Sequence, residues 1–419
     1  MKEVNASIIT IGDELLIGQT IDTNSAFIGT ELNKIGIWVK KRIAIGDVKE
    51  DILEALTEQS KTSQVIIITG GLGPTADDIT KPALCTYFDS NLILNEEALQ
   101  NVKHIFTRLN RPIIDRNLKQ AEVPHNCTVL INTRGTAPGM WFQKEGVVYI
   151  SLPGVPHEMK GLIETSVLPK LKESFELPAI LHKTLLLAGK GESEMAELLT
   201  PFEAALPTHI KLAYLPSYGM IRLRLTGKSD NKAQLEEELT KLFNQLKDMV
   251  KEWMVIDEDL PIEQAVSKIL KSRGKTLGTA ESCTGGNIAH LITTHSGSSQ
   301  FFIGTVVSYA NEVKTDVLGV KEDILNAYGA VSEETVSQMA IGAKKVLKTD
   351  YVIATSGIMG PEGGTAEKPV GTVWIAIAGP QGVRASKHHF RFDRKRNIDL
   401  ASVTALNLLR KYLQAEELN

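Results

Sequence analysis

The sequence predicts an α/β protein with two layered α/β domains joined by a small α+β module. Short β-branched runs alternate with amphipathic helical segments toward both ends of the chain. Glycine-rich turns follow several of these runs, and strands joined by helices indicate parallel, doubly wound sheets. The chain of 419 residues is also too long for a single hydrophobic core, so more than one domain is expected.

The first domain is expected to span residues 1–172. Strands are predicted at 7–11, 38–45, 65–69 and 147–152, and helices at 23–34 and 50–59. The run at 65–69 is continuously apolar, which is typical of a strand buried on both faces. Ligands of such sheets bind beyond the carboxyl ends of the strands. We therefore expect a ligand site at the turns that follow Ile11 and Thr69.

The other two parts are expected to span residues 173–255 and 256–419. The middle module combines strands at 182–187 and 220–226 with a helix at 232–250 that is rich in Glu and Lys. The acidic residues Asp257, Glu258 and Asp259 precede Pro261 and indicate a linker. The last domain alternates helices at 262–271, 285–293, 333–346 and 398–413 with strands at 276–280, 305–309, 351–356 and 372–378.

Charge and cysteine content narrow the possible function classes. The formal net charge of −4 gives no excess of positive charge of the kind that nucleic-acid-binding proteins carry. Cys85, Cys127 and Cys283 lie far apart, without metal-ligand spacing, and their odd number argues against a disulfide framework. No signal peptide pattern and no membrane-spanning run is evident. We therefore expect a cytoplasmic protein that makes no membrane contact.

Ser282 is the candidate nucleophile of the last domain. It lies between a predicted strand and a predicted helix, where unpaired backbone N–H groups can stabilise an oxyanion. Serine needs a base, and Lys314 follows the next strand together with Tyr309; a desolvated lysine can be neutral near pH 7. The same pattern also fits a helix cap at Ser282 and a solvated Lys314. Cys283 is the competing nucleophile.

Four strings occur in order along the last domain: AESCTGG, SYANEVK, TSGIMGPEGGTAEKPVGTVWIA and FDRKR. Together they resemble the C-terminal domain of the CinA family (competence/damage-inducible protein A), the nicotinamide mononucleotide (NMN) deamidase. The resemblance implies Ser282 as nucleophile, Tyr309 as assisting residue and Lys314 as general base. It implies hydrolysis of the NMN carboxamide to nicotinate mononucleotide and ammonia through an acyl-enzyme, without a cofactor.

The same resemblance implies a set of substrate contacts. The segment from Gly360 to Thr365 resembles the loop that encloses the substrate, and Ser356 stands where the family commonly has threonine. The late arginine of the family pattern F-x-G-x-R matches Arg396, with Arg394 in place of the glycine. The expected substrate-binding residues are Glu281, Thr284, Gly285, Gly286, Ser356, Gly360, Gly364, Thr365 and Arg396. The basic residues Arg384, Lys387, Arg391, Arg394 and Lys395 also fit a solvated edge strand.

The first domain carries the strings GDELL, DTN, GGLGPTADDIT and LPGVPHEM. They resemble the molybdopterin-binding, MoaB/MogA-like fold in the form that the CinA family has. The resemblance implies an ADP-ribose pyrophosphatase that uses a divalent metal and releases AMP and ribose 5-phosphate. The alternative is a site that only binds a pterin or a nucleotide.

Two sets of residues are expected at this first site. Glycine backbone allows close approach of N–H groups to phosphate, and adjacent carboxylates can hold a divalent cation; Asp78 also fits a helix cap. The expected phosphate-site residues are Gly12, Gly70, Gly71, Gly73, Thr75 and Thr80. The expected metal ligands are Asp13, Glu14, Asp77, Asp78 and Glu158.

The middle module resembles a KH domain. Gly189-Lys190-Gly191-Glu192 differs from the G-x-x-G clamp of nucleic-acid-binding KH domains, and the acidic residues Glu192, Glu194 and Glu197 would repel phosphate. We therefore expect a spacer or dimer element and no nucleic-acid partner.

The whole chain is thus expected to be a bifunctional hydrolase of pyridine-nucleotide recycling, acting on NMN and ADP-ribose, and the resemblance favours a homodimer. The alternative class is a partner in competence or recombination, for which the long basic patch with interleaved aromatic residues is missing.

Overall fold

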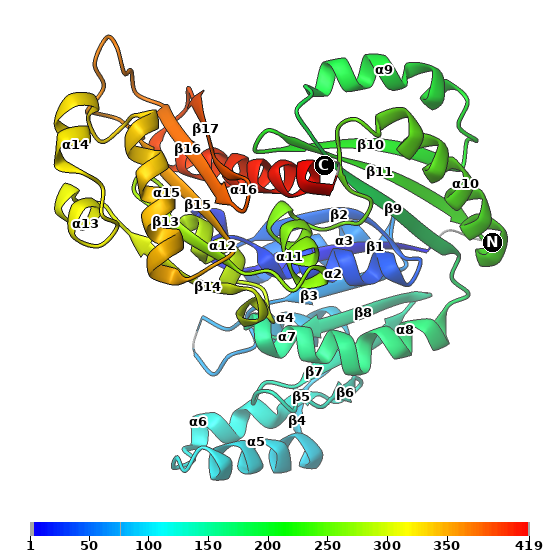
Figure 1. The fold of residues 1–419 in the computed structure, drawn as a ribbon. Helices are drawn as coiled ribbons and strands as arrows, with labels where there is room; N and C mark the ends of the chain where they lie inside the picture. Colours follow the sequence, from blue (N-terminus) through cyan, green and yellow to red (C-terminus); the bar gives the residue numbers. More distant parts are fainter. Residues whose placement is uncertain (1–3, 76, 418–419) are drawn as a thin grey trace. The chain divides into compact units, whose positions relative to one another are not determined.

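The computed structural model describes residues 4–75 and 77–417. The chain divides into two compact units, one formed by Met1–Leu181 with Gly227–Glu238 and the other by His182–Thr226 with Leu239–Asn419. Figure 1 traces the elements of each, which confirm the expected α/β class. No helix of the described part is long and apolar enough to cross a membrane.

The N-terminal part is built on a six-stranded sheet with the order β2-β1-β3-β8-β7-β6. β1, β2, β3 and β8 pair in parallel, whereas β7 and β6 add an antiparallel edge. A separate two-stranded sheet pairs β4 with β5. The elements are β1 (Asn5–Ile11), α1 (Asp13–Leu16), α2 (Thr23–Lys34), β2 (Trp38–Ile45), α3 (Lys49–Ser60), β3 (Val65–Thr69), α4 (Thr80–Tyr87), β4 (Leu92–Leu94), α5 (Glu96–Arg108), α6 (Asp115–Leu118), η1 (Lys119–Ala121), β5 (Glu122–Pro124), β6 (Thr128–Leu130), β7 (Gly139–Lys144), β8 (Val147–Leu152), α7 (Pro156–Leu162), η2 (Ile163–Val167) and α8 (Leu168–Ser174).

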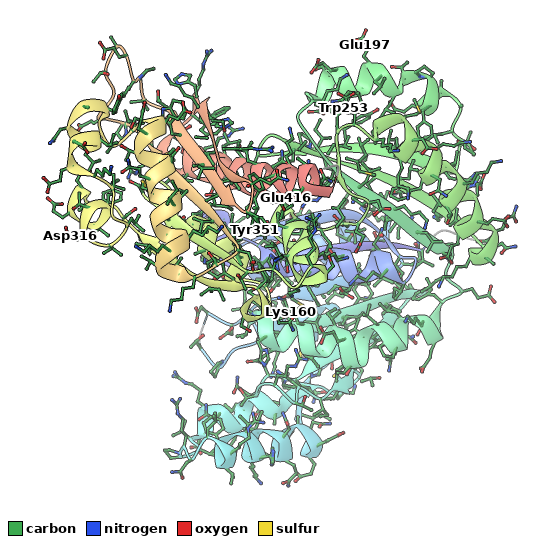
Figure 2. The ribbon with its side chains drawn as sticks, viewed as in Figure 1. Lys160, Glu197, Trp253, Asp316, Tyr351 and Glu416 are labelled. Carbon is green, nitrogen blue, oxygen red and sulfur yellow. The ribbon has the colours of Figure 1, made fainter. Side chains whose placement is uncertain are left out.

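Alternation along the central strands places apolar side chains on both faces of this sheet. Ile8 and Ile67 are buried in one hydrophobic cluster, which includes residues of α2, α7 and α8, whereas Ile9 and Ile66 are buried in another with α3 and α4. A strand that is buried on both faces needs an apolar residue at every position. The continuous run Val65–Thr69 therefore forms the middle of the sheet, as predicted. Figure 2 labels Lys160 of α7, whose Nζ lies 5.2 Å from the ring centroid of Phe27 in α2.

The middle module contains a four-stranded sheet with the order β10-β11-β9-β12. Met195 and Leu199 of α9 and Leu239 and Leu246 of α10 are buried. The acidic residues of the expected linker are paired, because Lys247 bonds Asp257 at 2.9 Å and Lys268 bonds Glu258. The elements are β9 (Ala179–Ala188), α9 (Glu192–Ala204), β10 (Ile210–Ser217), β11 (Met220–Ser229), α10 (Lys232–Val250) and β12 (Met254–Ile256).

The C-terminal part is built on a five-stranded sheet with the order β14-β13-β15-β16-β17. β13, β14 and β15 are parallel, whereas β16 and β17 are antiparallel. One hydrophobic cluster holds α11, α12 and α16, and another holds α15. The elements are α11 (Ile262–Ser272), β13 (Leu277–Glu281), α12 (Asn287–Thr293), η3 (Ser298–Gln300), β14 (Phe302–Val307), α13 (Asn311–Asp316), α14 (Glu322–Tyr328), α15 (Glu333–Leu347), β15 (Tyr351–Gly357), β16 (Thr372–Gly379), β17 (Gly382–His389) and α16 (Arg394–Glu417).

The last helix is held to the sheet by a buried polar contact as well as by apolar packing. Figure 2 labels Tyr351 of β15 and Glu416 of α16, and the Tyr351 hydroxyl donates to Glu416 Oε2 at 2.6 Å. Burial, with the nearby Glu416 carboxylate, raises the pKa of Tyr351, so the phenol stays protonated and remains a donor.

Several predicted boundaries in this part differ from the structure, and three of them bear on the segments around the candidate site. α12 begins at Asn287 and not at 285, because Gly285 and Gly286 have φ values of +60° and +95°, outside the helical region. β14 ends at Val307, so Ser308 and Tyr309 lie in the loop before α13. α16 begins at Arg394 and not at 398.

Candidate active sites

The turns after four parallel strands enclose a hollow of about 560 Å³ at the carboxyl edge of the N-terminal sheet. We call it the N-terminal hollow. Gly70 has a φ of +116°, and a Cβ atom there would overlap the carbonyl oxygen of Ile11, so only glycine fits. The residues that line it are Ile11, Gly12, Glu14, Asp47, Gly70, Gly71, Leu72, Gly73, Pro74, Asp77, Asp78, Phe106, Asn117, Gln120, Thr136, Ala137, Pro153, Gly154, Val155 and Glu158.

The expected phosphate residues divide into two groups. The glycines Gly12, Gly70, Gly71 and Gly73 line the hollow. Thr75 and Thr80 do not, because their hydroxyls are bonded within the loop. Thr80 is buried and donates from Oγ1 to the carbonyl of Gly70 at 3.0 Å, whereas Thr75 donates to Asp78 through its backbone N–H at 2.9 Å and its hydroxyl. Both threonines therefore shape the loop.

The expected metal ligands also differ in their surroundings. Glu14, Asp77, Asp78 and Glu158 line the hollow, but Asp13 does not. Asp78 accepts hydrogen bonds from Gly73 N at 2.7 Å and from Thr75, so its carboxylate closes the loop. Glu158 accepts a hydrogen bond from Asn132 Nδ2 at 2.6 Å, and burial raises its pKa.

Asp47 is a carboxylate at this site that the sequence analysis missed. It follows β2 in the dipeptide Gly46-Asp47, just as Gly12-Asp13 follows β1. Its backbone N–H donates to Asp13 Oδ1 at 3.3 Å, and its Oδ2 accepts from Asp13 N at 3.2 Å. Burial raises the pKa of Asp47, and the carboxylates of Asp13, Glu14 and Asp77 raise it further. The repeated Gly-Asp after a parallel strand was the signal that could have identified it.

These carboxylates do not form a complete metal cage. Within residues 4–75 and 77–417, no group of three or more His, Cys, Asp or Glu side chains could hold a metal ion by itself. Mg²⁺ is commonly held by one or two carboxylates together with substrate phosphates and water. The like-charged cluster around Asp47 fits that incomplete kind of site, because a cation would relieve its mutual repulsion.

A second cavity, of about 270 Å³, lies at the carboxyl edge of the C-terminal sheet. We call it the serine pocket. It brings together Ser282 after β13, Tyr309 and Lys314 after β14, and Ser356 in β15. Its lining residues are Ser282, Cys283, Tyr309, Asn311, Lys314, Ala330, Val331, Ser356, Gly357, Ile358, Met359, Gly360, Glu362, Gly363 and Arg394.

Lys314 is a buried lysine, with 1% of its surface exposed. Its Nζ donates to the carbonyl oxygens of Ser308 at 2.8 Å, Tyr309 at 3.1 Å and Ala310 at 3.4 Å. Burial lowers its pKa below the ordinary lysine value, although Cys283 and Glu312 oppose that shift. The three carbonyl oxygens can accept from the three N–H bonds of the protonated amine, and the two shorter contacts also suit the two N–H bonds of the neutral form.

Cys283 lines the same pocket but is a poor nucleophile. Burial raises the pKa of its thiol to about 12, so it stays protonated near neutral pH. The thiolate is the reactive form of cysteine. Between the two adjacent side chains, the structure therefore favours Ser282 for attack.

Glu281 lies next to the nucleophile but faces the protein interior. It is fully buried and does not line the serine pocket. Its carboxylate accepts hydrogen bonds from Thr284 Oγ1 at 2.8 Å and from the backbone N–H groups of Gly286, Ile288 and Ala289 at 3.0, 3.0 and 2.9 Å. Glu281 thus fixes the turn at the start of α12. Thr284, Gly285 and Gly286 belong to this turn and likewise lie outside the pocket lining.

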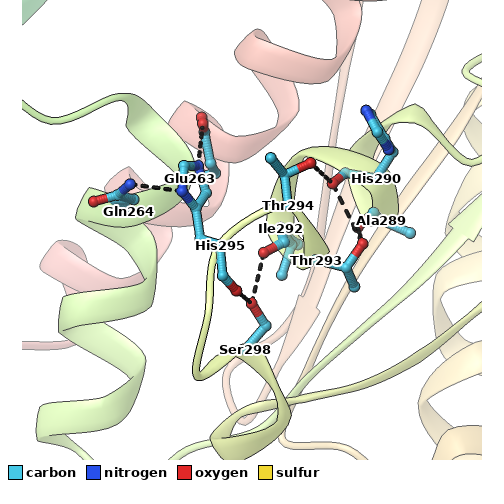
Figure 3. Close-up of polar contacts among 9 residues, drawn as sticks. All are labelled: Glu263, Gln264, Ala289, His290, Ile292, Thr293, Thr294, His295 and Ser298. Atoms are coloured by element: carbon cyan, nitrogen blue, oxygen red, sulfur yellow. Dashed lines mark hydrogen bonds and ion pairs between the residues drawn. The ribbon is translucent and has the colours of Figure 1, made fainter. Parts of the chain in front are cut away.

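Polar contacts beyond α12 anchor its other end. Figure 3 shows His295 between two residues of α11, with Nε2 3.0 Å from Glu263 Oε1 and Nδ1 2.7 Å from Gln264 Nε2. The Ser298 hydroxyl donates to the carbonyl of Ile292 at 2.6 Å. The nucleophile turn is therefore attached to a helix that is fixed at both ends.

The loop after β15 supplies one wall of the serine pocket. Gly360 lines it, but Gly364 and Thr365 do not; Thr365 instead closes a turn, with its N–H donating to Lys368 O at 3.0 Å. The Ser356 hydroxyl donates to the carbonyl of Ala330 at 2.6 Å.

The arginine at the serine pocket is Arg394, and Arg396 lies outside the lining. Arg394 donates to the carbonyl of Gly360 at 2.8 Å and to the Tyr309 hydroxyl at 3.1 Å. The guanidinium of Arg396 lies over the Phe392 ring, 4.2 Å from its centroid. Asp393 Oδ1 accepts from Arg396 N at 3.0 Å and so caps α16, which begins at Arg394 and therefore earlier than expected.

Two further basic features have contacts of their own. In the Gly189–Glu192 segment, Lys190 Nζ lies 4.2 Å from the ring centroid of Trp253. The acidic residues that follow begin α9, and Glu194 accepts a hydrogen bond from Gly191 N at 3.1 Å. Figure 2 labels Trp253 and, on α9, Glu197. Arg384 lies over the Tyr412 ring at 5.0 Å.

Comparison with known proteins assigns a family to each part. Residues 7–173 match the probable molybdopterin binding domain, residues 182–255 the damage-inducible protein CinA KH domain, and residues 259–413 the CinA C-terminal domain.

Relatives match along nearly the whole chain. A CinA-like protein of Cytophaga hutchinsonii is 46% identical, covering 98% of both chains, and one of Flavobacterium psychrophilum is 48% identical, covering 97% of this chain and 98% of its own. A CinA superfamily structure from Klebsiella pneumoniae is 34% identical, covers 37% of this chain and 96% of its own, and superposes with a TM-score of 0.36. The chain therefore belongs to the CinA family, with a molybdopterin-binding-like N-terminal domain, a KH module and a CinA C-terminal domain.

Proposed function

We propose that the serine pocket hydrolyses the carboxamide of NMN to nicotinate mononucleotide and ammonia. The observation that carries the proposal is that Ser282 and the buried Lys314 line one pocket together with Arg394. A serine becomes nucleophilic when a neighbouring base accepts its proton. Burial lowers the pKa of Lys314, which favours the neutral amine that can accept this proton.

The reaction divides into acylation and deacylation. Ser282 Oγ attacks the carboxamide carbon while Lys314 Nζ takes the hydroxyl proton. The C–N bond then breaks, and the nitrogen takes that proton and leaves as ammonia. Water, deprotonated by the same amine, attacks the ester and releases the carboxylate and Ser282. Tyr309 is suited to assist near the reacting groups, because Arg394 donates to its hydroxyl and fixes its orientation.

We assign the contact with the NMN phosphate to Arg394 and not to Arg396. A guanidinium suits phosphate because its N–H groups form a planar fork. Arg394 faces the pocket and uses two of its N–H groups on Gly360 and Tyr309. The others remain for the NMN phosphate. Ser356 and Gly360 are the other expected substrate residues that line the pocket.

The test is incubation of the purified chain with NMN, with ammonia and nicotinate mononucleotide measured together. Ser282→Ala and Lys314→Met should each lose at least about a thousandfold in kcat. An unchanged circular dichroism spectrum is required of both variants. Release of ammonia by either variant at the wild-type rate would exclude the mechanism.

For the N-terminal hollow we infer metal-dependent hydrolysis of the ADP-ribose diphosphate to AMP and ribose 5-phosphate. The supporting observation is that glycine turns and the carboxylates of Glu14, Asp47 and Asp77 line the same hollow. Glu14 and Asp47 would hold a divalent cation, which would supply charge neutralisation and an activated water when bound. Backbone N–H groups of the glycine turns would hold the diphosphate oxygens.

The competing function of this hollow is binding without turnover. Incubation of the full chain with ADP-ribose and Mg²⁺, Mn²⁺ or Co²⁺ separates the two. AMP that depends on the cation and is lost in Asp47→Asn supports hydrolysis. Saturable nucleotide binding without AMP under every cation supports the binding function.

A further inference from the structure

Ser308, at the end of β14, carries a buried hydroxyl that the fold leaves unused. The residue is fully buried, and its Oγ has no hydrogen-bond partner among the described residues. A buried hydroxyl without a partner is destabilising, and such groups are rare in folded proteins. A role in the reaction of the neighbouring serine pocket would explain why this position holds a serine.

The strand register places Ser308 beside the nucleophile. Ser308 N donates to the carbonyl of Glu281 at 2.9 Å, which continues the parallel pairing of β14 with β13 and sets Ser308 level with Ser282. Two residues earlier, the paired Ala280 and Val306 both pack in the hydrophobic cluster that holds α15. Alternate residues of a strand share a face, and neighbouring strands lie about 4.8 Å apart. The side chains of Ser282 and Ser308 are therefore neighbours on one face of the sheet.

Ser308 also contacts the proposed base. Lys314 Nζ donates to the carbonyl oxygen of Ser308 at 2.8 Å and to those of Tyr309 and Ala310. Within residues 4–75 and 77–417, the hydrogen bonds of this amine go to these carbonyls, and none joins it to Ser282 Oγ. The proton of the nucleophile therefore has no direct hydrogen bond to the amine. A serine hydroxyl can fill such a gap, because it donates one hydrogen bond and accepts others.

We propose that Ser308 is a catalytic residue that relays the proton of Ser282 to Lys314. Rotation about χ1 moves its Oγ between staggered positions. During attack the Ser282 proton passes to Ser308 Oγ, the Ser308 proton passes to Lys314 Nζ, and Ser282 Oγ bonds to the substrate carbon. When the C–N bond breaks, one proton passes back through Ser308 to the departing nitrogen, which leaves as ammonia. The inference rests on the proposed function of the serine pocket and specifies the path of its proton.

The test follows the modification of Ser282 by a fluorophosphonate in the full chain, with the rate read by mass spectrometry. This probe needs an activated serine but no NMN. Ser282 Oγ forms a bond to phosphorus, fluoride leaves, and Lys314 releases the relayed proton to solvent. Removal of a proton-transfer group costs roughly 100-fold or more in rate, so Ser308→Ala should slow the modification by about 100-fold. In mixtures of light and heavy water, the wild-type rate should depend quadratically on the deuterium fraction, because both relayed protons move in one step.

Thr305→Val is the matched control. Thr305 Oγ1, on the same strand, is likewise buried without a partner among the described residues. Thr305 directly precedes Val306 and so lies on the opposite face of the sheet, away from Ser308. Both variants should keep or exceed the wild-type Tm, because each removes an unpaired hydroxyl. Only Ser308→Ala should slow the modification, whereas a purely structural role would lower the Tm together with the rate.

Failure of the relay and failure of the proposed reaction give different results. Modification of Ser282 that Ser308→Ala slows, in a protein that does not hydrolyse NMN, would refute only the NMN reaction and support the relay. The relay would be overturned by a linear deuterium dependence in wild type, by no modification of Ser282, by a wild-type rate in Ser308→Ala, or by an equal loss in Thr305→Val. The deuterium measurement needs no variant and decides the question even if a substitution unfolds the protein.

Discussion

Glu281→Gln tests whether a buried carboxylate builds the nucleophile turn. The substitution keeps the size of the side chain but replaces one acceptor oxygen with an NH₂ group. Oε2 accepts from Thr284 Oγ1, Gly286 N and Ile288 N, and Oε1 accepts from Thr279 Oγ1 and Ala289 N. Whichever way the amide turns, its NH₂ group must face at least one backbone donor.

The expected size of the effect follows from these bonds. Hydrogen bonds to a charged group contribute about 1.5–3 kcal/mol, against about 1 kcal/mol for neutral ones. A buried donor left unpaired costs about 1–3 kcal/mol more. Because glutamine is neutral, the variant lacks the free-energy cost of burying a charged carboxylate, and this offsets part of the loss. We therefore expect the free energy of opening this turn to fall by about 3 kcal/mol, which corresponds to roughly 100-fold faster amide exchange.

Hydrogen exchange read by mass spectrometry on peptides that cover residues 282–293 measures this opening directly. Gly286, Ile288 and Ala289 should lose protection, while peptides of α15 should not. kcat for NMN should fall with a smaller change in KM, because the nucleophile and not the pocket wall is displaced. Glu333→Gln, at the exposed start of α15, is the control. Unchanged exchange at Gly286 and Ile288 in Glu281→Gln would refute the reasoning.

The remaining predictions concern the serine pocket. In the proposed mechanism neutral Lys314 accepts the proton, and burial lowers its pKa. kcat/KM should therefore rise with pH through a midpoint below the ordinary lysine pKa of 10.5. A pH profile without this rise, or activity in Lys314→Arg, would contradict the role of Lys314. Cys283→Ala should keep NMN hydrolysis within about tenfold, and iodoacetamide at pH 8 should leave Cys283 unmodified by mass spectrometry, because its pKa is raised to about 12. Arg394→Ala should raise the KM for NMN by about 100-fold while Arg396→Ala should not; the opposite ranking in initial-rate assays would return the anionic contact to Arg396.

The layered fold could be predicted from the sequence because its strongest signals are local. Val65–Ile68 is apolar at every position and lies in the buried strand β3, and the helix at Thr23–Lys34 was predicted with the bounds that it has in the structure. The antiparallel edge strands β6 and β7 and the small β4–β5 sheet were not predicted, because short strands beside turns give little periodicity.

The site was only partly predictable, because side-chain direction depends on tertiary packing. Ser282, Tyr309 and Lys314 come from separate segments, and the structure brings them to one pocket. The sequence could not distinguish Arg394 from Arg396, although only Arg394 lines the pocket. Nor could it show that Glu281, next to the nucleophile, turns inward.

At the N-terminal hollow, the sequence indicated glycines and carboxylates but not their individual roles. Asp78 is used by its own loop, whereas Asp47 was missed although it repeats the Gly-Asp pattern of the first strand. Gln120 and Phe106 also line this hollow, although neither belongs to a motif that the sequence would indicate.

The most direct test of the central claim is the reaction of the purified full chain with NMN, followed by ammonia and nicotinate mononucleotide. Wild type should release the two products in equal amounts. Ser282→Ala should release neither, while it keeps the wild-type exchange protection of the turn at Gly286. Equal product formation by wild type and Ser282→Ala would contradict the assignment of Ser282 as the nucleophile.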